Sequence, residues 1–216
     1  MSTEHKAWLF DYQAFSNEVA NTLFHALDSN EVAGLEAFIN QHYASMTDPW
    51  TWGELPENWE ELLKQRGDKL SVLMLGDLAL TRYRDMADNI GLGYGFDALG
   101  EYLKSVPALK PIAEALIGGY WFGPRGKRFD PGYMGTGFTS PEQAQEHLAL
   151  LTETELPPIP EANSPIYRDC FYKPEKAEQV QEALDHLIQI YEMAVNKGYG
   201  VLFADFNDLP QGSPSW

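Results

Sequence analysis

A glycine-rich segment, residues 118–137, carries the best candidate for binding chemistry in this sequence. It holds seven of the 18 glycines. Three of only 15 basic residues lie within a span of four positions inside it, at Arg125, Lys127 and Arg128. Glycines let backbone N–H groups converge on a ligand, while Arg and Lys supply positive charge. The segment therefore predicts an anion-binding loop formed by these three residues and Gly126. The alternative is a solvated turn between two strands, whose charges offset acidic neighbours.

A second candidate is a short stretch in which carboxylates cluster beside tryptophans. Trp50 and Trp52 lie beside Glu54 and Glu57. Aromatic faces and carboxylates both attract cations. The stretch predicts a partner-binding surface for a cation or a basic protein. The alternative is a solvated acidic helix face over a tryptophan core.

The remaining reactive side chains form no pattern typical of catalysis or metal binding. Cys170 has no local signature of a nucleophile, so we expect a small buried cysteine. Glu182 and His186 are four positions apart, but two ligands do not make a metal site. The run from Gly91 to Gly95 lacks the spacing of a dinucleotide-binding fingerprint, and we expect no strand before it. The sequence thus predicts turn glycines there and neither a metal nor a cofactor.

The charge balance restricts the class of partner. The chain has 216 residues, with 32 acidic and 15 basic side chains, so its net charge is −17 and its sequence pI about 4.5. Nucleic acids and anionic membrane surfaces both require Lys and Arg in excess, and we exclude them as partners. An acidic chain favours cationic ligands and basic proteins.

The sequence also predicts a location in the cytoplasm. A single cysteine cannot form an intrachain disulfide, which suits a reducing compartment. Residues 1–6 are polar and no apolar run typical of a signal peptide follows them. The longest uncharged apolar stretch, residues 115–124, is far shorter than the ~20 residues of a membrane-spanning helix.

The periodicity of apolar residues predicts a mostly helical chain with a strand near each end. Strands are expected at residues 7–10 and 199–206. Helices are expected at residues 12–27, 30–46, 57–66, 69–84, 97–106, 108–117, 140–151 and 174–197. Because strands and helices do not alternate, the prediction is an α+β fold, in which a small, mainly antiparallel sheet includes both terminal strands. We expect one domain over residues 1–206 and a flexible tail over 207–216.

Several helix ends have recognisable capping residues. Ser140 is followed by proline and then by Gln143, which is the pattern of a capping box. Asn30 and Asp97 are the expected N-caps of two other helices. Gly198 is expected to end the longest helix.

The C-terminal two-thirds resembles the YfbM-like family of bacterial proteins. Two stretches carry the resemblance. One runs from Ala115-Leu-Ile-Gly-Gly119 through the glycine-rich connection to Thr139-Ser-Pro-Glu-Gln143. The other is the long helix and Val-Leu-Phe strand of residues 184–206. The resemblance implies an α+β fold and a cytosolic bacterial protein, and it implies no catalytic residue.

These observations lead to three functional hypotheses. The first is a non-enzymatic acidic module that binds another protein, and one version of it is an immunity-type antagonist that covers a basic toxin. The second is a small-molecule binding protein or enzyme with an anion site in the loop 118–137. The third is a structural subunit of a homo-oligomer.

Overall fold

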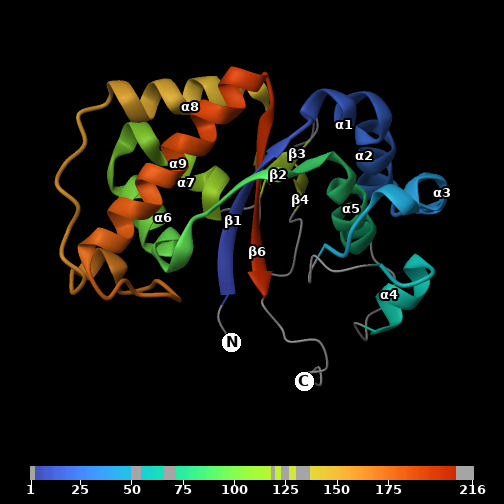
Figure 1. Ribbon diagram of the computed structural model, residues 1–216, viewed down its shortest axis with the longest axis horizontal. Helices are drawn as coiled ribbons and strands as arrows, with labels where there is room; N and C mark the ends of the chain where they lie inside the picture. The colour runs from blue at the N-terminus through green and yellow to red at the C-terminus, as the bar shows by residue number, and fades with distance from the viewer. Residues whose placement is uncertain are drawn as a thin grey trace.

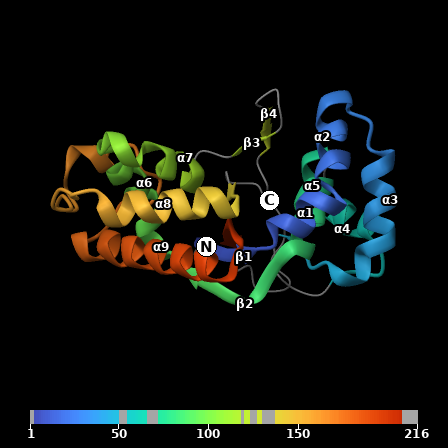
Figure 2. The same cartoon turned by 90° about the horizontal axis from the view of Figure 1, so that it is seen from above.

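A four-stranded antiparallel sheet lies between two groups of helices in the computed structural model (Figures 1 and 2). The structure describes residues 3–49, 55–65, 72–117, 120–122, 127–129 and 137–207. The strand order is β2-β1-β6-β5. The two central strands come from opposite ends of the chain: β1 (Thr3–Phe10) pairs with β6 (Gly200–Asn207) over its whole length. The predicted α+β fold, with both terminal strands in one small antiparallel sheet, is confirmed.

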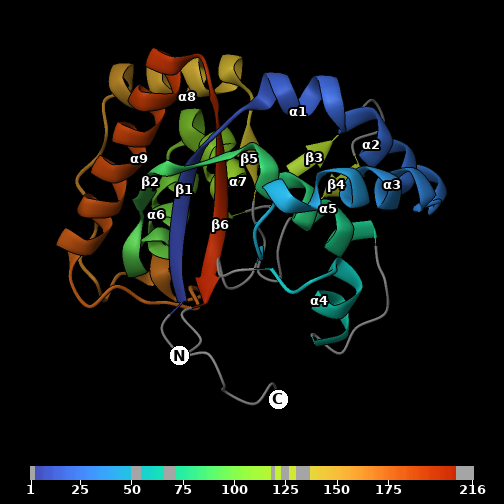
Figure 3. The ribbon, with the colours of Figure 1, turned by 45° about the vertical axis from the view of Figure 1, so that its right-hand side comes forward.

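The edge strands differ in length and in origin. The strand β2 (Arg84–Gly91) pairs with β1, and the two-residue β5 (Phe138–Thr139) pairs with β6. Two further short strands, β3 (Tyr120–Phe122) and β4 (Lys127–Phe129), form a separate antiparallel hairpin. The hairpin lies on the opposite side of the molecule from β2 (Figures 2 and 3).

One helical group covers the sheet face that carries Ala7, Leu9, Val201 and Phe203. These four side chains are buried in one apolar cluster together with residues of the long helices. The group consists of η3 (Gly93–Gly95), α6 (Phe96–Ser105), η4 (Pro107–Leu109), α7 (Lys110–Ile117), α8 (Pro141–Glu153), η5 (Pro165–Tyr167) and α9 (Ala177–Lys197). In α9, apolar residues recur every three or four positions from Val180 to Ala194, so one face of the helix is buried.

The other helical group packs against the opposite face of the sheet. Phe10, Phe138 and Leu202 belong to a second apolar cluster with these helices. The group consists of α1 (Tyr12–Glu18), α2 (Ala20–Ser29), α3 (Ala33–His42), η1 (Tyr43–Ser45), α4 (Trp59–Gln65), α5 (Val72–Leu80) and η2 (Thr81–Tyr83). Alternate residues of β1 and β6 thus serve two separate cores.

The structure confirms two predicted helix ends and corrects two others. Ser140 and Gln143 form the expected capping box, and Gly198 ends α9 with a positive φ of 70°. Asn30 does not begin a helix; it ends α2 in the left-handed conformation that asparagine tolerates. Asp97 lies inside the first turn of α6, which begins one residue earlier, so its carboxylate is free to bond elsewhere.

The strand β2 is the principal element that the sequence analysis missed. The helix expected to reach residue 84 ends at Leu80, and β2 begins at Arg84. Our expectation of no strand before Gly91 was therefore wrong. An edge strand pairs on one side only and tolerates polar residues, so it lacks the apolar alternation on which the prediction depended. The expected single helix over residues 12–27 is also two helices, separated at Val19.

Candidate partner-binding surface

The helices α8 and α9 pack side by side on the outside of the first helical group (Figures 1 and 2). Their inward faces contact the apolar core, and one buried polar pair joins them: Nδ1 of His147 lies 2.9 Å from the hydroxyl oxygen of Tyr191. Burial lowers the pKa of His147 to about 4, so its imidazole is neutral at physiological pH. All ionised groups of the two helices therefore lie on the outward side.

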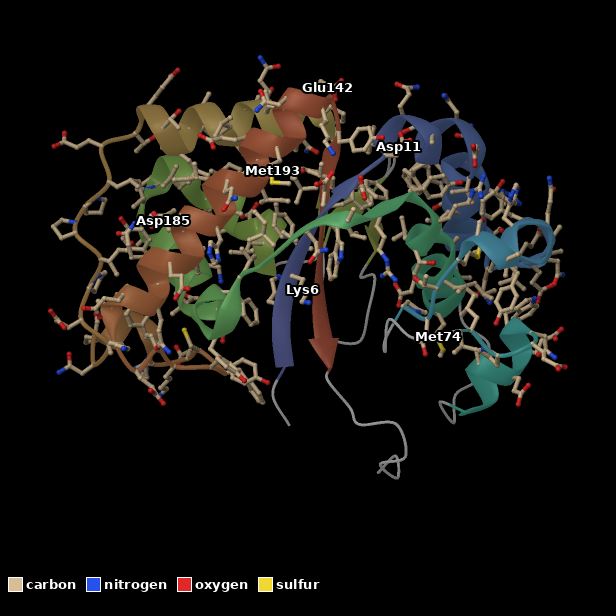
Figure 4. All side chains as sticks on the ribbon, in the orientation of Figure 1. Lys6, Asp11, Met74, Glu142, Asp185 and Met193 are labelled. Atoms are coloured by element: carbon tan, nitrogen blue, oxygen red, sulfur yellow. The ribbon has the colours of Figure 1, made fainter. Side chains whose placement is uncertain are left out.

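That outward side is strongly acidic. Three residues of α8 and four of α9 are exposed carboxylates, and we call them the acidic face: Glu142, Glu146, Glu153, Glu178, Glu182, Asp185 and Glu192. Figure 4 marks Glu142 at the start of α8 and Asp185 within α9. No Lys or Arg occurs in α8, and the single lysine of α9, Lys197, forms an ion pair with Asp88. The negative charge of the acidic face is thus not offset by any other Lys or Arg of these two helices.

An exposed aromatic cluster lies at one end of the same helical group. Among the residues described, the exposed large hydrophobic side chains are Tyr94 (47% exposed) and Phe171 (78% exposed). Both contact Tyr172, with ring centroids 6.1 Å and 4.8 Å away. We call these three residues the aromatic platform. Large apolar side chains left in water at one place are typical of a binding surface.

Hydrogen bonds and a buried ring hold the aromatic platform in place. The carboxylate of Asp97 accepts hydrogen bonds from the backbone N–H groups of Phe171 (2.6 Å) and Tyr172 (3.1 Å). The buried ring of Phe96 lies 6.2 Å from that of Tyr172 and stacks at 4.1 Å on the buried imidazole of His5. The platform is therefore connected to the central sheet and is not carried by a loop alone.

A pocket of about 260 Å³ adjoins the platform, where the turn from Gly91 to Gly95 meets α9. Gly95 permits this close approach, because a Cβ atom there would lie 2.1 Å from the carbonyl oxygen of Gln179. Gly93 has a positive φ of 62°, which glycine adopts without strain. We call this the glycine-turn pocket; its lining comprises Gly91, Leu92, Gly93, Tyr94, Gly95, Gln179, Glu182 and His186.

The pocket contains one carboxylate and one imidazole, those of Glu182 and His186. Nδ1 of His186 lies 2.8 Å from the carbonyl oxygen of Gly91. Because a carbonyl can only accept, Nδ1 carries a hydrogen, and in the neutral ring Nε2 is an acceptor. Glu182 lies one turn earlier on α9 and is exposed. Glu182 and His186, four positions apart in the sequence, therefore line one pocket.

A larger polar cavity, of about 500 Å³, lies between the second helical group and the sheet. It is lined by Asp11, Ala14, Glu18, Arg82, Tyr83, Arg84, Asp85 and Tyr199. Its charged groups bind one another: Arg82 Nε and the Tyr83 hydroxyl both donate to Glu18, at 3.2 and 3.0 Å. Desolvation opposes these bonds, but together with the charge of Arg82 they lower the pKa of Glu18 below its ordinary value.

The second guanidinium of this cavity serves the fold. Arg84 is buried, donates to the hydroxyl of Thr47 and lies 5.8 Å from the centre of the Trp8 ring. Burial lowers its pKa to about 9, against the attraction of Asp48, so it keeps its charge at neutral pH. Arg84 thus connects β2 to the loop after η1. We regard the polar cavity as a structural network, because its three carboxylates face two guanidinium groups.

The residues predicted from the sequence as binding sites fall mostly outside the described part of the chain. This applies to Arg125 and Gly126 of the anion-binding loop and to Trp50, Trp52 and Glu54 of the tryptophan–carboxylate stretch. Lys127 and Arg128 lie in β4, opposite Phe122 and Trp121 of β3. Glu57 is exposed just before α4. Both predicted sites stay predictions.

Two further expectations can be compared with the structure. Cys170 is buried, as predicted, and burial raises the pKa of its thiol to about 11, so it is not activated as a nucleophile. The aromatic platform was not predicted. The adjacent aromatic residues Phe171 and Tyr172, in a segment otherwise rich in proline and polar residues, are the signal that could have indicated it.

No family model, curated protein or solved structure matches this chain. The resemblance to the YfbM-like family accordingly stays a prediction. Within the ranges that the structure describes, no helix combines the length and apolar character needed to cross a bilayer. In the same ranges, no three His, Cys, Asp or Glu side chains come together as a metal would require.

Proposed function

We propose that this protein is a non-enzymatic binding module for a basic protein partner and that it acts in the cytoplasm. The observation that carries the proposal is the acidic face, where seven exposed carboxylates of α8 and α9 have no neighbouring Lys or Arg on either helix except the paired Lys197. An immunity-type antagonist, which covers a basic toxin, is one specific form of this function.

Physical chemistry explains why such a face suits a protein partner. Fields from several like charges add, so they accelerate the diffusional encounter with a basic protein and orient it. A net charge of −17 strengthens the effect over the whole molecule. The cytoplasmic location rests on the single cysteine, which cannot form an intrachain disulfide and suits a reducing compartment.

The test compares two forms of the protein as bait. The variant carries Glu142→Gln, Glu146→Gln, Glu178→Gln and Asp185→Asn, which keep side-chain size but remove four charges from the acidic face. All four residues are exposed, so the variant should fold with little change in stability. Proteins captured by the wild type are purified, and their association rates with both baits are measured at increasing salt concentration.

The expected partner is basic, and its association rate falls by about tenfold or more between roughly 0.05 and 0.3 M salt, because the screening length falls from above ~10 Å to below ~8 Å over that range. The four substitutions should lower the rate at low salt by a similar factor. A partner whose association is insensitive to salt, or that binds both baits equally, would overturn the proposal.

A further inference from the structure

We propose that the glycine-turn pocket receives a Lys or Arg side chain of the partner, while the aromatic platform beside it contacts the partner's neighbouring residues. This inference rests on the proposed function and specifies the chemistry of the contact. It assigns a role to the aromatic platform, to Glu182 and to His186.

The first argument is the chemical character of the lining. The Glu182 carboxylate accepts hydrogen bonds only. His186 donates through Nδ1 to Gly91, so the ring atom left for a ligand is Nε2, an acceptor in the neutral ring. Ammonium and guanidinium groups are donors only, and they carry the charge opposite to that of Glu182. The pocket is therefore complementary to a cationic side chain.

The second argument is the size and the edge of the pocket. A volume of about 260 Å³ is smaller than the roughly 300–1,000 Å³ typical of sites for drug-sized ligands. Tyr94 belongs both to the lining and to the aromatic platform, and its ring is half exposed. A cation that enters beside Tyr94 can lie against an aromatic ring, which adds about 0.5–1 kcal/mol at exposed sites.

The third argument is the aromatic platform itself. Phe171 exposes 78% of its surface, yet its backbone N–H is fixed by Asp97. A partner that covers this ring gains the free energy of apolar burial without ordering the segment first. Aromatic residues with few rotatable bonds are enriched among the residues that dominate binding energy. The platform thus offers an apolar contact directly beside the cationic one.

The charges around the site decide between a basic partner and a second copy of this chain. Glu178, Glu182 and Asp185 lie on the exposed side of α9 next to the pocket. Two copies that met through this surface would bring these carboxylates together, and like charges at an interface oppose association. A basic segment neutralises them instead.

The experiment measures binding of a short fluorescein-labelled peptide of alternating arginine and glycine to the full chain, by fluorescence anisotropy. A second peptide has citrulline in place of arginine, which keeps the shape and removes the charge. The variants are Glu182→Gln, Tyr94→Leu and their combination. Glu60→Gln is the control, because it removes one exposed charge from α4, outside both the pocket lining and the acidic face. Melting temperatures establish that each variant is folded.

We expect the arginine peptide to bind and the citrulline peptide to bind at least about tenfold more weakly. The double variant should lose about tenfold in affinity, and Glu60→Gln less than about twofold, from the free energies typical of cation–π contacts and exposed ion pairs. A further variant carries Glu142→Gln, Glu146→Gln and Glu153→Gln. If this variant binds the arginine peptide more weakly while the pocket variants bind it as the wild type does, this inference is wrong and the proposed function stays intact.

Two other outcomes are informative. If the citrulline peptide binds as tightly as the arginine peptide, charge recognition is absent and the proposed function falls together with this inference. Zinc is also added in competition with the peptide. If zinc displaces the peptide at a concentration below that of the peptide, and if His186→Gln abolishes zinc binding, the pocket is a metal site and the inference is wrong.

Discussion

At the scale of single residues, the buried histidine between α8 and α9 makes folding stability depend on pH. The pKa of His147 is about 4 in the folded protein, because burial disfavours the charged ring, against an ordinary value of 6.5. Above pH 6.5 both states are neutral and the folded state keeps its full stability. Between pH 6.5 and 4 only the unfolded chain binds the proton, so the free energy of unfolding should fall by about 3 kcal/mol.

A His147→Gln variant isolates this contribution. Glutamine cannot be protonated but can still bond to Tyr191, so the variant should lose some stability at pH 7 and show a shallower decline towards pH 4. Urea unfolding of both proteins at several pH values measures the difference. Parallel pH profiles for the two proteins would show that other groups cause the acid dependence.

At the scale of elements, the glycine turn before α6 controls how β2 and α9 fit together. A methyl group at Gly95 would lie 2.1 Å from a backbone carbonyl of α9, so Gly95→Ala must separate the turn from the helix. We expect a loss of about 2–3 kcal/mol, as for overpacked cores, and a loss of peptide binding at the glycine-turn pocket.

Gly93→Ala is the control for this prediction. A Cβ atom at position 93 has open space around it, but the φ of 62° is unfavourable for alanine, which costs roughly 1–2 kcal/mol. Chemical denaturation ranks the two variants, and equal losses in stability with intact peptide binding in both would contradict the close-contact argument.

The hairpin of β3 and β4 allows the two main functional hypotheses to be separated. The protein-partner proposal predicts that phosphate, sugar phosphates and small carboxylates leave the melting temperature unchanged. An anion site would instead stabilise the folded state by about 2.7 kcal/mol at a hundredfold excess over its dissociation constant. A rise in melting temperature that disappears in the Arg125→Ala, Arg128→Ala double variant would therefore favour the anion-binding loop.

Elements with a strong local signal were predictable from the sequence, and those fixed by distant contacts were not. The capping box at Ser140 and the glycine end of α9 depend on neighbouring residues and were predicted. The role of Asp97 was missed because its bonding partner, Phe171, is 74 positions away. The local sequence at a helix start predicts that an Asp is the N-cap, whereas in the fold Asp97 holds the loop at Phe171.

The candidate site shows the same limit. The acidity of the α8 and α9 segments is visible in the sequence, and the fold places the two helices side by side. Tyr94 lies in η3 and Tyr172 in the loop before α9, and they come together through the fold. The candidate residues found by composition, such as Trp50 and Arg125, were chosen because unusual residue types cluster locally. In the platform only Phe171 and Tyr172 are adjacent, and Tyr94 joins them through the fold.

At the scale of the whole molecule, the shared sheet couples the two apolar cores. Alternate residues of β1 and β6 enter opposite cores, as with Leu9 on one side and Leu202 on the other. Loss of either core therefore exposes strands on which the other depends. We expect residues 1–206 to unfold as one domain, in a single transition.

This coupling can be tested with one substitution on each face. Leu9→Ala and Leu202→Ala remove side chains of equal size that are both buried, so each should lower the free energy of unfolding by about 2–5 kcal/mol. Unfolding is followed both by far-UV circular dichroism and by the fluorescence of a dye attached to an engineered cysteine at exposed Glu31, in a Cys170→Ser background. Since the dye reports only on the second helical group, coincident curves in both variants support one domain. If Leu9→Ala shifts the circular dichroism transition and leaves the dye transition in place, the two helical groups fold independently, each with its own side of the sheet.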